Sequence, residues 1–537
     1  MKYNSILVTI LVIILYTVSP ADDYRKIYIF YTNDLHGGIT EQEADFLNPE
    51  FPPLLGGGAA AANIIFSYRK QTRDTDDIVL VFDAGDIFQG TPLGTKTEGR
   101  AIIDYMNQVG YDAGAAGNHD FDLGKEVFID LTKRARFPIL SANLKDGSTG
   151  EVFSHVKPYT ILEKKGLRIG VFGISTEATK NMSFPKNIEG LEFTAEAPAA
   201  QRAVKALRAE GVDLVIALVH MGLPYDTEEG YRELKKAEED RDMKVSYLNA
   251  MEMASYVTGI DLLFGGHIHR GYQEPWEDPV NHTLCFQNYG NGGNLGLAEI
   301  LLDRETKTIA GYELPGRDGG LMLLTMDEFW PDKEIYADIK ARQAEVEKGY
   351  DEVVGVSKVD LTRSGQGESP MSNLICDAMI QATGAEFSIT NFGGIRADLR
   401  AGPITRRDLF KVLPFGNSLV VLQVTGEFLK QIIESKITGS RSGLAIGGGK
   451  IEYEQERADG NKITYFSVGE YPLYPKKVYR IVTTDYLAEG NSGMDLLLEV
   501  NDANIARTGI LLRDAVSEYI QEHSPLLIEP DGRWKKR

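Results

Sequence analysis

The sequence has few cysteines, a deficit of positive charge and only one long apolar run. Cys285 and Cys376 are the two cysteines among 537 residues, which excludes a framework of structural disulfides. Cys376 lies in the apolar helical pattern "SNLICDAMI" and is predicted to be a small buried side chain. The formal net charge of −21 argues against a nucleic acid polymer bound through its backbone. It does not exclude a small anion held by metal ions, because bound cations dominate the local field.

The one long apolar run lies at the N-terminus. Lys2 is followed by "SILVTILVIILYTV" and then by Ser19, Pro20 and Ala21, a pattern typical of a secretory signal peptide over residues 1–21. The alternative is an uncleaved anchor, although the run is short for a full membrane span. We therefore expect an exported protein of the periplasm or the extracellular or cell-surface space, with no stable membrane span after cleavage.

Between residues 26 and about 325, short β-branched runs such as "KIYIFY", "DIVLVF" and "DLVIALVH" alternate with helical stretches such as "GRAIIDYMNQVG" and "APAAQRAVKALRAEG". This alternation predicts a layered α/β domain over residues 22–325. Residues 327–350 are charged and rich in helix formers, which predicts a linker helix within 326–353. A helix at "SNLICDAMIQATG" and strands at "SLVVLQVTG", "GKIEYEQE" and "VYRIVTTDYL" predict a second domain over 354–537.

Metal-ligand side chains follow five of the predicted strands. Carboxyl ends of strands in an α/β sheet meet at one edge, so we expect these side chains around one point. Carboxylate and neutral imidazole suit zinc, manganese, iron or cobalt, and seven donors exceed one tetrahedral site. The pattern therefore predicts two divalent metal ions bridged by one carboxylate. The seven residues are Asp34, His36, Asp86, Asn118, His220, His267 and His269.

Alternative interpretations exist for single residues of this set. One histidine after a strand, such as His220, is more often a satisfied core histidine than a ligand. Asp83 is expected to be a supporting acid rather than a ligand. The clustering decides for metal binding, because five of the eight histidines lie in these turns. By contrast, the glycines before Lys450 lack the spacing of a phosphate-binding loop and predict a turn into a strand.

Long motifs resemble those of the 5′-nucleotidase family, which belongs to the calcineurin-like dinuclear metallophosphoesterases. The motifs are "YTNDLHG", "DAGDIFQGTPLG", "MNQVGYDAGAAGNHDFDLG" and "GGHIHRG", followed by "SNLICDAMI", "ITNFGGIR", "GPITRRDLFKVLPFGNSL" and "YLAEGNSGMD". The resemblance implies a four-layer α/β/β/α metallophosphoesterase sandwich, then a linker helix and a smaller α+β substrate-binding domain. It also implies rotation of the two domains between open and closed forms.

The resemblance assigns roles to matching positions. Asp34, His36 and His269 would hold one metal ion, and Asn118, His220 and His267 the other, with Asp86 bridging. His119 and Asp122 match the catalytic pair. Positions that match substrate-binding residues are Asn391, Arg396, Phe415 and Tyr486. Ahead of the "SNLICDAM" helix, where the family has several arginines, this chain offers only Arg363 as a substrate-binding residue. The chain departs from the family pattern at Ser372, where glycine is usual, and at Ser492, where an acidic residue is common.

The expected activity is hydrolysis of nucleoside 5′-monophosphates, small-molecule substrates, by a hydroxide that two metals activate. Family alternatives are hydrolysis of UDP-sugars, nucleotide diphosphates or 2′,3′-cyclic nucleotides, the last combined with 3′-nucleotidase activity, and cleavage of sulfur–sulfonate bonds. Hypotheses of other classes are a nucleotide-binding surface protein without catalysis and a structural secreted module. A missing ligand or a missing His119 would favour the binding protein, and none is missing.

Overall fold

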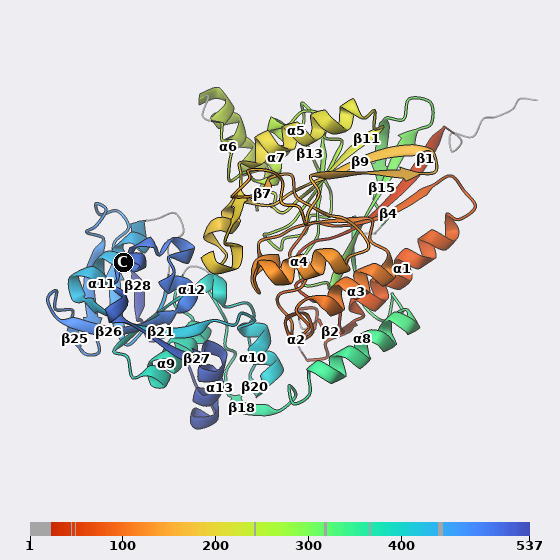
Figure 1. Ribbon diagram of the computed structural model, residues 1–537. Coiled ribbons are helices and arrows are strands. Elements are labelled where there is room, and N and C mark those ends of the chain that lie inside the picture. The colour runs from red at the N-terminus through yellow and green to blue at the C-terminus, as the bar shows by residue number, and fades with distance from the viewer. Residues whose placement is uncertain are drawn as a thin grey trace, which may run out of the picture.

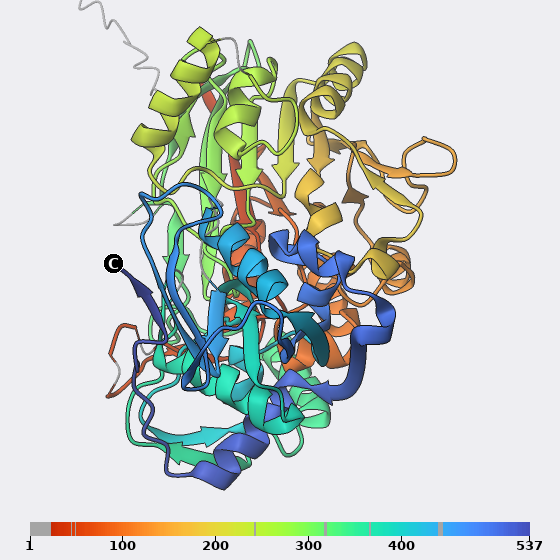
Figure 2. The same ribbon diagram turned by 90° about the vertical axis from the view of Figure 1, so that its left-hand side faces the viewer.

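The computed structural model describes residues 23–44, 46–48, 50–240, 243–315, 319–364, 367–438 and 444–537. The expected signal peptide lies outside these residues. Figure 1 shows a large first domain, coloured red to green, and a smaller second domain, coloured cyan to blue. In Figure 2 the second domain lies in front of the first. Among the described helices, none is long and apolar enough to cross a membrane.

Two large sheets form the centre of the first domain, beside two short pairs of strands. One has the order β16-β15-β1-β4-β5-β6, with β17 beside β15, and the other has the order β13-β14-β12-β11-β9-β8. Strands β1, β4, β5 and β6 are parallel, as are β9, β11, β12 and β14. Their bounds are β1 Tyr24–Thr32, β4 Ile78–Asp83, β5 Ala113–Ala115, β6 Ile139–Leu140, β8 Tyr159–Lys164, β9 Leu167–Ile174, β11 Leu214–Val219, β12 Leu262–Gly265, β13 Trp276–Glu277, β14 Leu284–Gln287, β15 Asn294–Asp303, β16 Ile309–Glu313 and β17 Leu321–Leu323.

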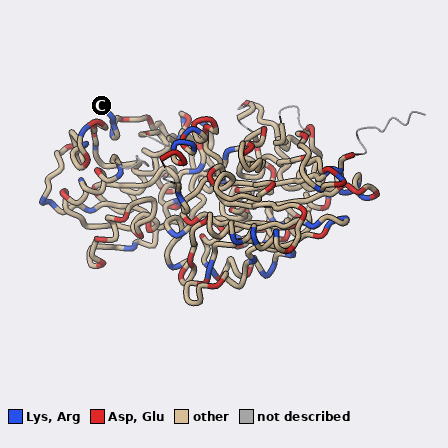
Figure 3. Tube along the Cα trace, turned by 90° about the horizontal axis from the view of Figure 1, so that it is seen from above, with Lys and Arg blue, Asp and Glu red and all other residues tan. Residues whose placement is uncertain are grey.

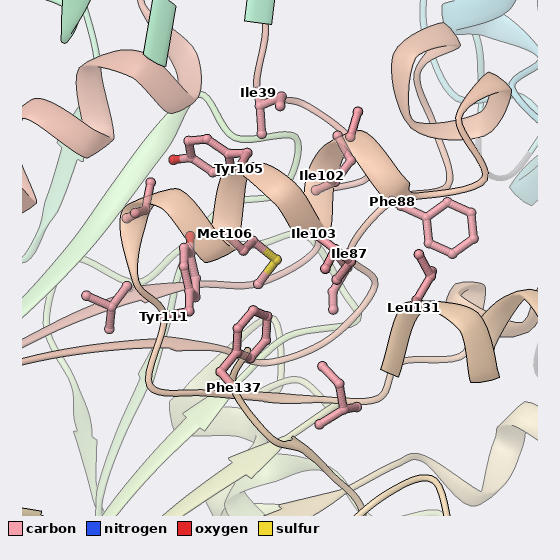
Figure 4. Close-up of a cluster of buried hydrophobic side chains, with 14 of the residues drawn as sticks. Ile39, Ile87, Phe88, Ile102, Ile103, Tyr105, Met106, Tyr111, Leu131 and Phe137 are labelled. Carbon is pink, nitrogen blue, oxygen red and sulfur yellow. The ribbon is translucent and has the colours of Figure 1, made fainter. Parts of the chain in front are cut away.

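Three apolar clusters hold the layers of this domain together. Phe82, Val171 and Phe264 belong to the cluster between the two sheets. A second cluster lies under α1 (Gly57–Gln71), α3 (Arg100–Val109) and α4 (Lys125–Arg134) on the first sheet, and Figure 4 shows Ile102 and Met106 of α3 within it. A third lies under α5 (Glu196–Ala209) and α7 (Ala250–Tyr256) on the second sheet. The expected four-layer α/β/β/α sandwich is therefore confirmed.

The helix expected over 327–350 is α8, Lys333–Val346, and it is shorter at both ends. The Asp332 carboxylate accepts hydrogen bonds from the backbone N–H groups of Glu334 and Ile335 at 3.1 and 3.0 Å, so it caps the first turn. Ile335 and Ile339 are buried in the cluster beneath α1 and α3. Helix α8 therefore packs on the first domain, and the chain leaves it at 347–353 (Figure 1).

The second domain has a five-stranded sheet of order β22-β19-β26-β21-β27 and a four-stranded sheet of order β25-β24-β23-β28. Apolar clusters fill both faces of the larger sheet. The bounds are β18 Val353–Ser357, α9 Pro370–Thr383, β19 Phe387–Asn391, β20 Gly402–Thr405, α10 Arg406–Val412, β21 Ser418–Thr425, α11 Gly426–Thr438, β22 Leu444–Gly447, β23 Gly449–Tyr453, β24 Ile463–Val468, β25 Tyr471–Pro472, β26 Val478–Thr484, α12 Asp485–Ala488, β27 Ile505–Leu511, α13 Leu512–His523 and β28 Trp534–Lys536.

Both cysteines are free and buried, and burial was predicted for Cys376. Acidic and basic residues are interspersed along both domains in Figure 3. The strong negative charge of the chain is therefore spread over the molecule rather than gathered in one segment.

Candidate dinuclear metal centre

The turns after β1, β4, β5, β11 and β12 bring metal-ligand atoms to one place, as the strand-end pattern predicted. Asp34, His36 and His269 form one group of donor atoms, and Asp86, His220 and His267 form another. Within each group, the ligand atoms lie within 4.8 Å of one another. Residues more than two hundred positions apart in the chain thus meet at one edge of the sandwich.

In the first group, two imidazoles face each other. His36 Nε2 lies 2.9 Å from His269 Nε2, and His36 Nδ1 lies 2.6 Å from the carbonyl oxygen of Gln89. Because a carbonyl can only accept, Nδ1 of His36 carries the proton and Nε2 presents a lone pair. Burial lowers the pKa of His36 to about 3, so the ring is neutral. The Nε2 atoms of His36 and His269 therefore face each other beside the Asp34 carboxylate, whose Oδ1 lies 3.7 Å from His269 Nε2. This arrangement of lone pairs and negative charge fits a bound cation.

In the second group, His220 is oriented in the same way. Its Nδ1 donates to the carbonyl oxygen of Ala84 at 2.8 Å. Its Nε2 lies 3.1 Å from Asp86 Oδ2 and 3.1 Å from Asn118 Oδ1. Burial lowers the pKa of His220, but the Asp86 carboxylate outweighs it and raises the pKa to about 10. Atoms that attract a proton so strongly in a buried site also suit a metal ion.

Asp86 lies between the two groups. Its Oδ2 is 3.1 Å from His220 Nε2 and 3.8 Å from His36 Nε2. Its Oδ1 accepts a hydrogen bond from the backbone N–H of His119 at 2.7 Å. One oxygen of this carboxylate therefore faces both donor groups, which is the position that a bridging ligand needs.

The backbone of these turns has an unusual conformation. Asp34, His36, Asp86, His267 and His269 have φ angles of 49°, 47°, 59°, 76° and 56°. Residues other than glycine rarely adopt this left-handed region, and such strain gathers at functional sites. The turns that contain these residues bring the donor atoms of neighbouring strands to a common centre.

His119 and Asp122 form the expected pair beside this centre. His119 Nδ1 lies 2.7 Å from Asp122 Oδ2. Burial lowers the pKa of His119, but the carboxylates of Asp122 and Asp86 outweigh it and raise the pKa above its usual value. The imidazole is therefore held in one orientation and favoured in its protonated form.

The second domain reaches the same site. Arg396 Nη2 lies 3.2 Å from His269 Nε2, and its guanidinium lies 5.9 Å from the Phe415 ring. The Phe415 ring stacks on the His119 ring at a centroid distance of 5.2 Å. Arg363 donates to the carbonyl oxygen of Arg396 at 2.6 Å. Two cationic side chains thus lie together at the edge of the metal centre.

Asn391 and Tyr486 lie farther along this domain. Asn391 is the last residue of β19, and Tyr486 follows β26 in α12. These strands are parallel neighbours, so both residues lie at the same end of the sheet. Asn491 Nδ2 donates to the Tyr486 carbonyl at 2.9 Å, and Ser492 Oγ donates to the Tyr486 hydroxyl at 3.4 Å. Ser492, the departure from the family pattern, therefore supports an aromatic ring.

Sequence reasoning missed Asp120. Its buried carboxylate accepts backbone hydrogen bonds from Gly117, Ile87 and Asp86 at 2.8, 2.9 and 3.2 Å. It ties the turn of Asp86 to the turn of His119. The sequence feature that could have indicated this residue is its position directly after Asn118 and His119 in "GNHD". Asp83, expected as a supporting acid, accepts from Thr32 Oγ1 at 2.6 Å and from the N–H of Gly85 at 2.8 Å.

Comparisons with known proteins agree with this architecture. Residues 27–271 match the calcineurin-like phosphoesterase family model, and residues 353–499 match the model of the 5′-nucleotidase C-terminal domain. Snake venom 5′-nucleotidase of Gloydius brevicauda is 28% identical over 96% of this chain and 90% of that protein. Endonuclease YhcR of Bacillus subtilis is 26% identical over 96% of this chain, which spans only 41% of that longer protein.

Among solved structures, the crystal structure of a 5′-nucleotidase precursor from Thermus thermophilus is similar over most of both chains. The TM-score is 0.80 at 27% identity, and the match covers 95% of this chain and 99% of that one. The similarity therefore extends over both domains.

Proposed function

We propose that this chain, a member of the 5′-nucleotidase family of calcineurin-like phosphoesterases, hydrolyses nucleoside 5′-monophosphates to nucleoside and phosphate. The observation that carries the proposal is the pair of donor groups that one oxygen of Asp86 faces, with His119 and Arg396 beside them. Asp34, His36 and His269 would hold one divalent cation, and Asn118, His220 and His267 the other. Two such cations would supply positive charge for the phosphate and lower the pKa of water.

His119 serves the leaving group in this proposal. The bond to Asp122 fixes the Nδ1 side of the ring, so the Nε2 N–H of the protonated imidazole is free to donate. That proton would stabilise negative charge on the phosphoryl oxygens and on the 5′-oxygen as the ester bond breaks. Asp122 orients the ring and keeps it protonated.

Arg396 and the aromatic residues bind the rest of the substrate. A guanidinium donates in a fork that suits phosphate, and the position of Arg396 beside His269 lets it bind an oxygen of the same phosphate. The carbonyl contact from Arg363 holds Arg396 in place. We assign base stacking to Phe415 and Tyr486 and a polar substrate contact to Asn391.

A panel of phosphate esters tests the reaction and the substrate class. We expect phosphate release from AMP to exceed release from UDP-glucose and 2′,3′-cyclic AMP, and to stop with a chelator and return with zinc, manganese or cobalt. Faster cleavage of UDP-glucose or of the cyclic nucleotide would assign those substrates instead. An oligonucleotide belongs in the panel because one relative is named an endonuclease. Full activity in the chelator would refute the two-metal assignment.

We also propose export, since the apolar run after Lys2 ends in small residues at 19–21. The expected result is a protein outside the cytoplasm that begins at Asp22. Cell fractionation and N-terminal sequencing of the protein from its own cells check this. A cytoplasmic protein that still begins at Met1 would contradict it.

A further inference from the structure

A segment of the first domain reaches the base-binding residues of the second domain. The Phe184 ring lies against the Tyr486 ring at a centroid distance of 5.8 Å and an angle of 85°. Figure 1 shows this gold part of the chain beside α12. Perpendicular aromatic pairs at this distance stabilise one relative orientation of the two rings. Tyr486 is thus contacted from both domains, by Phe184 on one side and by Ser492 and Asn491 within its own domain.

The Phe184 segment is tied to the turn that carries the catalytic pair. Ser183 Oγ donates to the carbonyl oxygen of Asn118 at 3.2 Å, and Asn187 Nδ2 donates to the carbonyl oxygen of Asp122 at 2.7 Å. These two bonds flank Phe184 in the sequence. The position of the Phe184 ring is therefore fixed relative to His119, where the phosphate ester would react.

Oppositely charged residues of the two domains also interact near this contact. The Lys186 ammonium lies 5.5 Å from the Phe184 ring centroid. Burial raises the pKa of Glu489, three residues after Tyr486, and the charge of Lys186 opposes this rise. The contact between Phe184 and Tyr486 is therefore accompanied by attraction between opposite charges on the same two segments.

We propose that Phe184 is a positioning residue for base recognition. It sets the orientation of Tyr486 from the first domain, so that the surface on which the base stacks is complete only when the two domains are together. This inference rests on the proposed function and deepens it, because it assigns a residue to base selectivity. Phe184 lies on the first domain, whereas Phe415 and Tyr486 both lie on the second.

The kinetic test separates base recognition from chemistry. For the Phe184→Ala variant we expect KM for AMP to rise about two- to tenfold, the range of an aromatic pair, with kcat unchanged. Hydrolysis of ribose 5-phosphate, which has no base, should be equal in the variant and the wild type. Phe184→Tyr should restore KM for AMP, while Phe184→Leu, with similar apolar volume, should not. Equal loss on both substrates, or full rescue by leucine, would overturn the proposal.

Binding of adenosine, measured by calorimetry, gives a readout independent of hydrolysis. Weaker binding in Phe184→Ala than in the wild type supports the inference even if AMP proves not to be a substrate, in which case the proposed function alone fails. Equal adenosine affinity in both proteins refutes the role of Phe184. The melting temperature of each variant shows whether the protein is still folded. If Phe184→Ala is destabilised, the comparison of Phe184→Tyr with Phe184→Leu decides the question.

Discussion

The His119→Ala variant is expected to keep its metal ions and to lose about 10²- to 10⁴-fold in kcat, the range for removal of a general acid or base. The side chain of His119 is absent from both donor groups, so its removal leaves the metal ligands in place. The variant loses the proton that the pair with Asp122 holds near the leaving oxygen. Turnover of AMP and metal content per chain, measured on the same preparation, check both halves of this expectation.

A matched variant separates the acid from its support. Asp122→Asn keeps the imidazole but removes the carboxylate that raises its pKa, so its loss should be smaller than that of His119→Ala. If metal content falls in parallel with activity in His119→Ala, the residue belongs to the metal site and the catalytic role is wrong.

The Asp86→Asn variant is expected to lose both metal ions together with activity, on the order of a thousandfold or more. The substitution keeps the volume of the side chain but removes the charge of the one carboxylate that faces both donor groups. A two-metal site contributes several kcal/mol of charge stabilisation to a phosphoryl transition state, which corresponds to this factor. Metal analysis and AMP turnover in the presence of added zinc or manganese measure the effect.

Asp83→Asn is the control for a buried acid in the same turn. Burial raises the pKa of Asp83 to about 8, so this carboxyl is largely protonated at neutral pH and asparagine resembles it. It lies outside both donor groups, and the variant should bind metal as the wild type does. Retention of two metal ions by Asp86→Asn, or loss of both by Asp83→Asn, would disprove the bridging assignment.

The sequence predicted the part of the site that is formed by ligand-type residues at the ends of apolar strands. Asp34, His220 and His267 follow apolar strands, and the carboxyl ends of parallel strands lie at one edge of a sheet, so these residues were expected to lie together. The assignment of ligands between two metals came only from the family resemblance, since spacing along the chain carries no such information. The start of α8 differed from the prediction because the Asp332 carboxylate caps the first turn, and a cap depends on one or two residues.

The contact between Phe184 and Tyr486 and the role of Asp120 could not be predicted from the sequence, for a different reason. Phe184 and Tyr486 meet across about three hundred residues, and neither is marked by periodicity or by a ligand-type side chain. Asp120 looked like one acid among several, whereas its three backbone hydrogen bonds exist only after two turns have come together. Such roles depend on tertiary geometry.

The left-handed backbone at five ligand positions has a consequence for metal selectivity. Each such residue costs of order 1–3 kcal/mol and persists only because the surrounding fold over-determines it. The sandwich therefore holds the donor atoms at set separations before an ion arrives. Discrimination among divalent ions then depends on how the coordination geometry of each ion fits these set positions, and oxygen-preferring ions such as calcium are disfavoured by the imidazole donors.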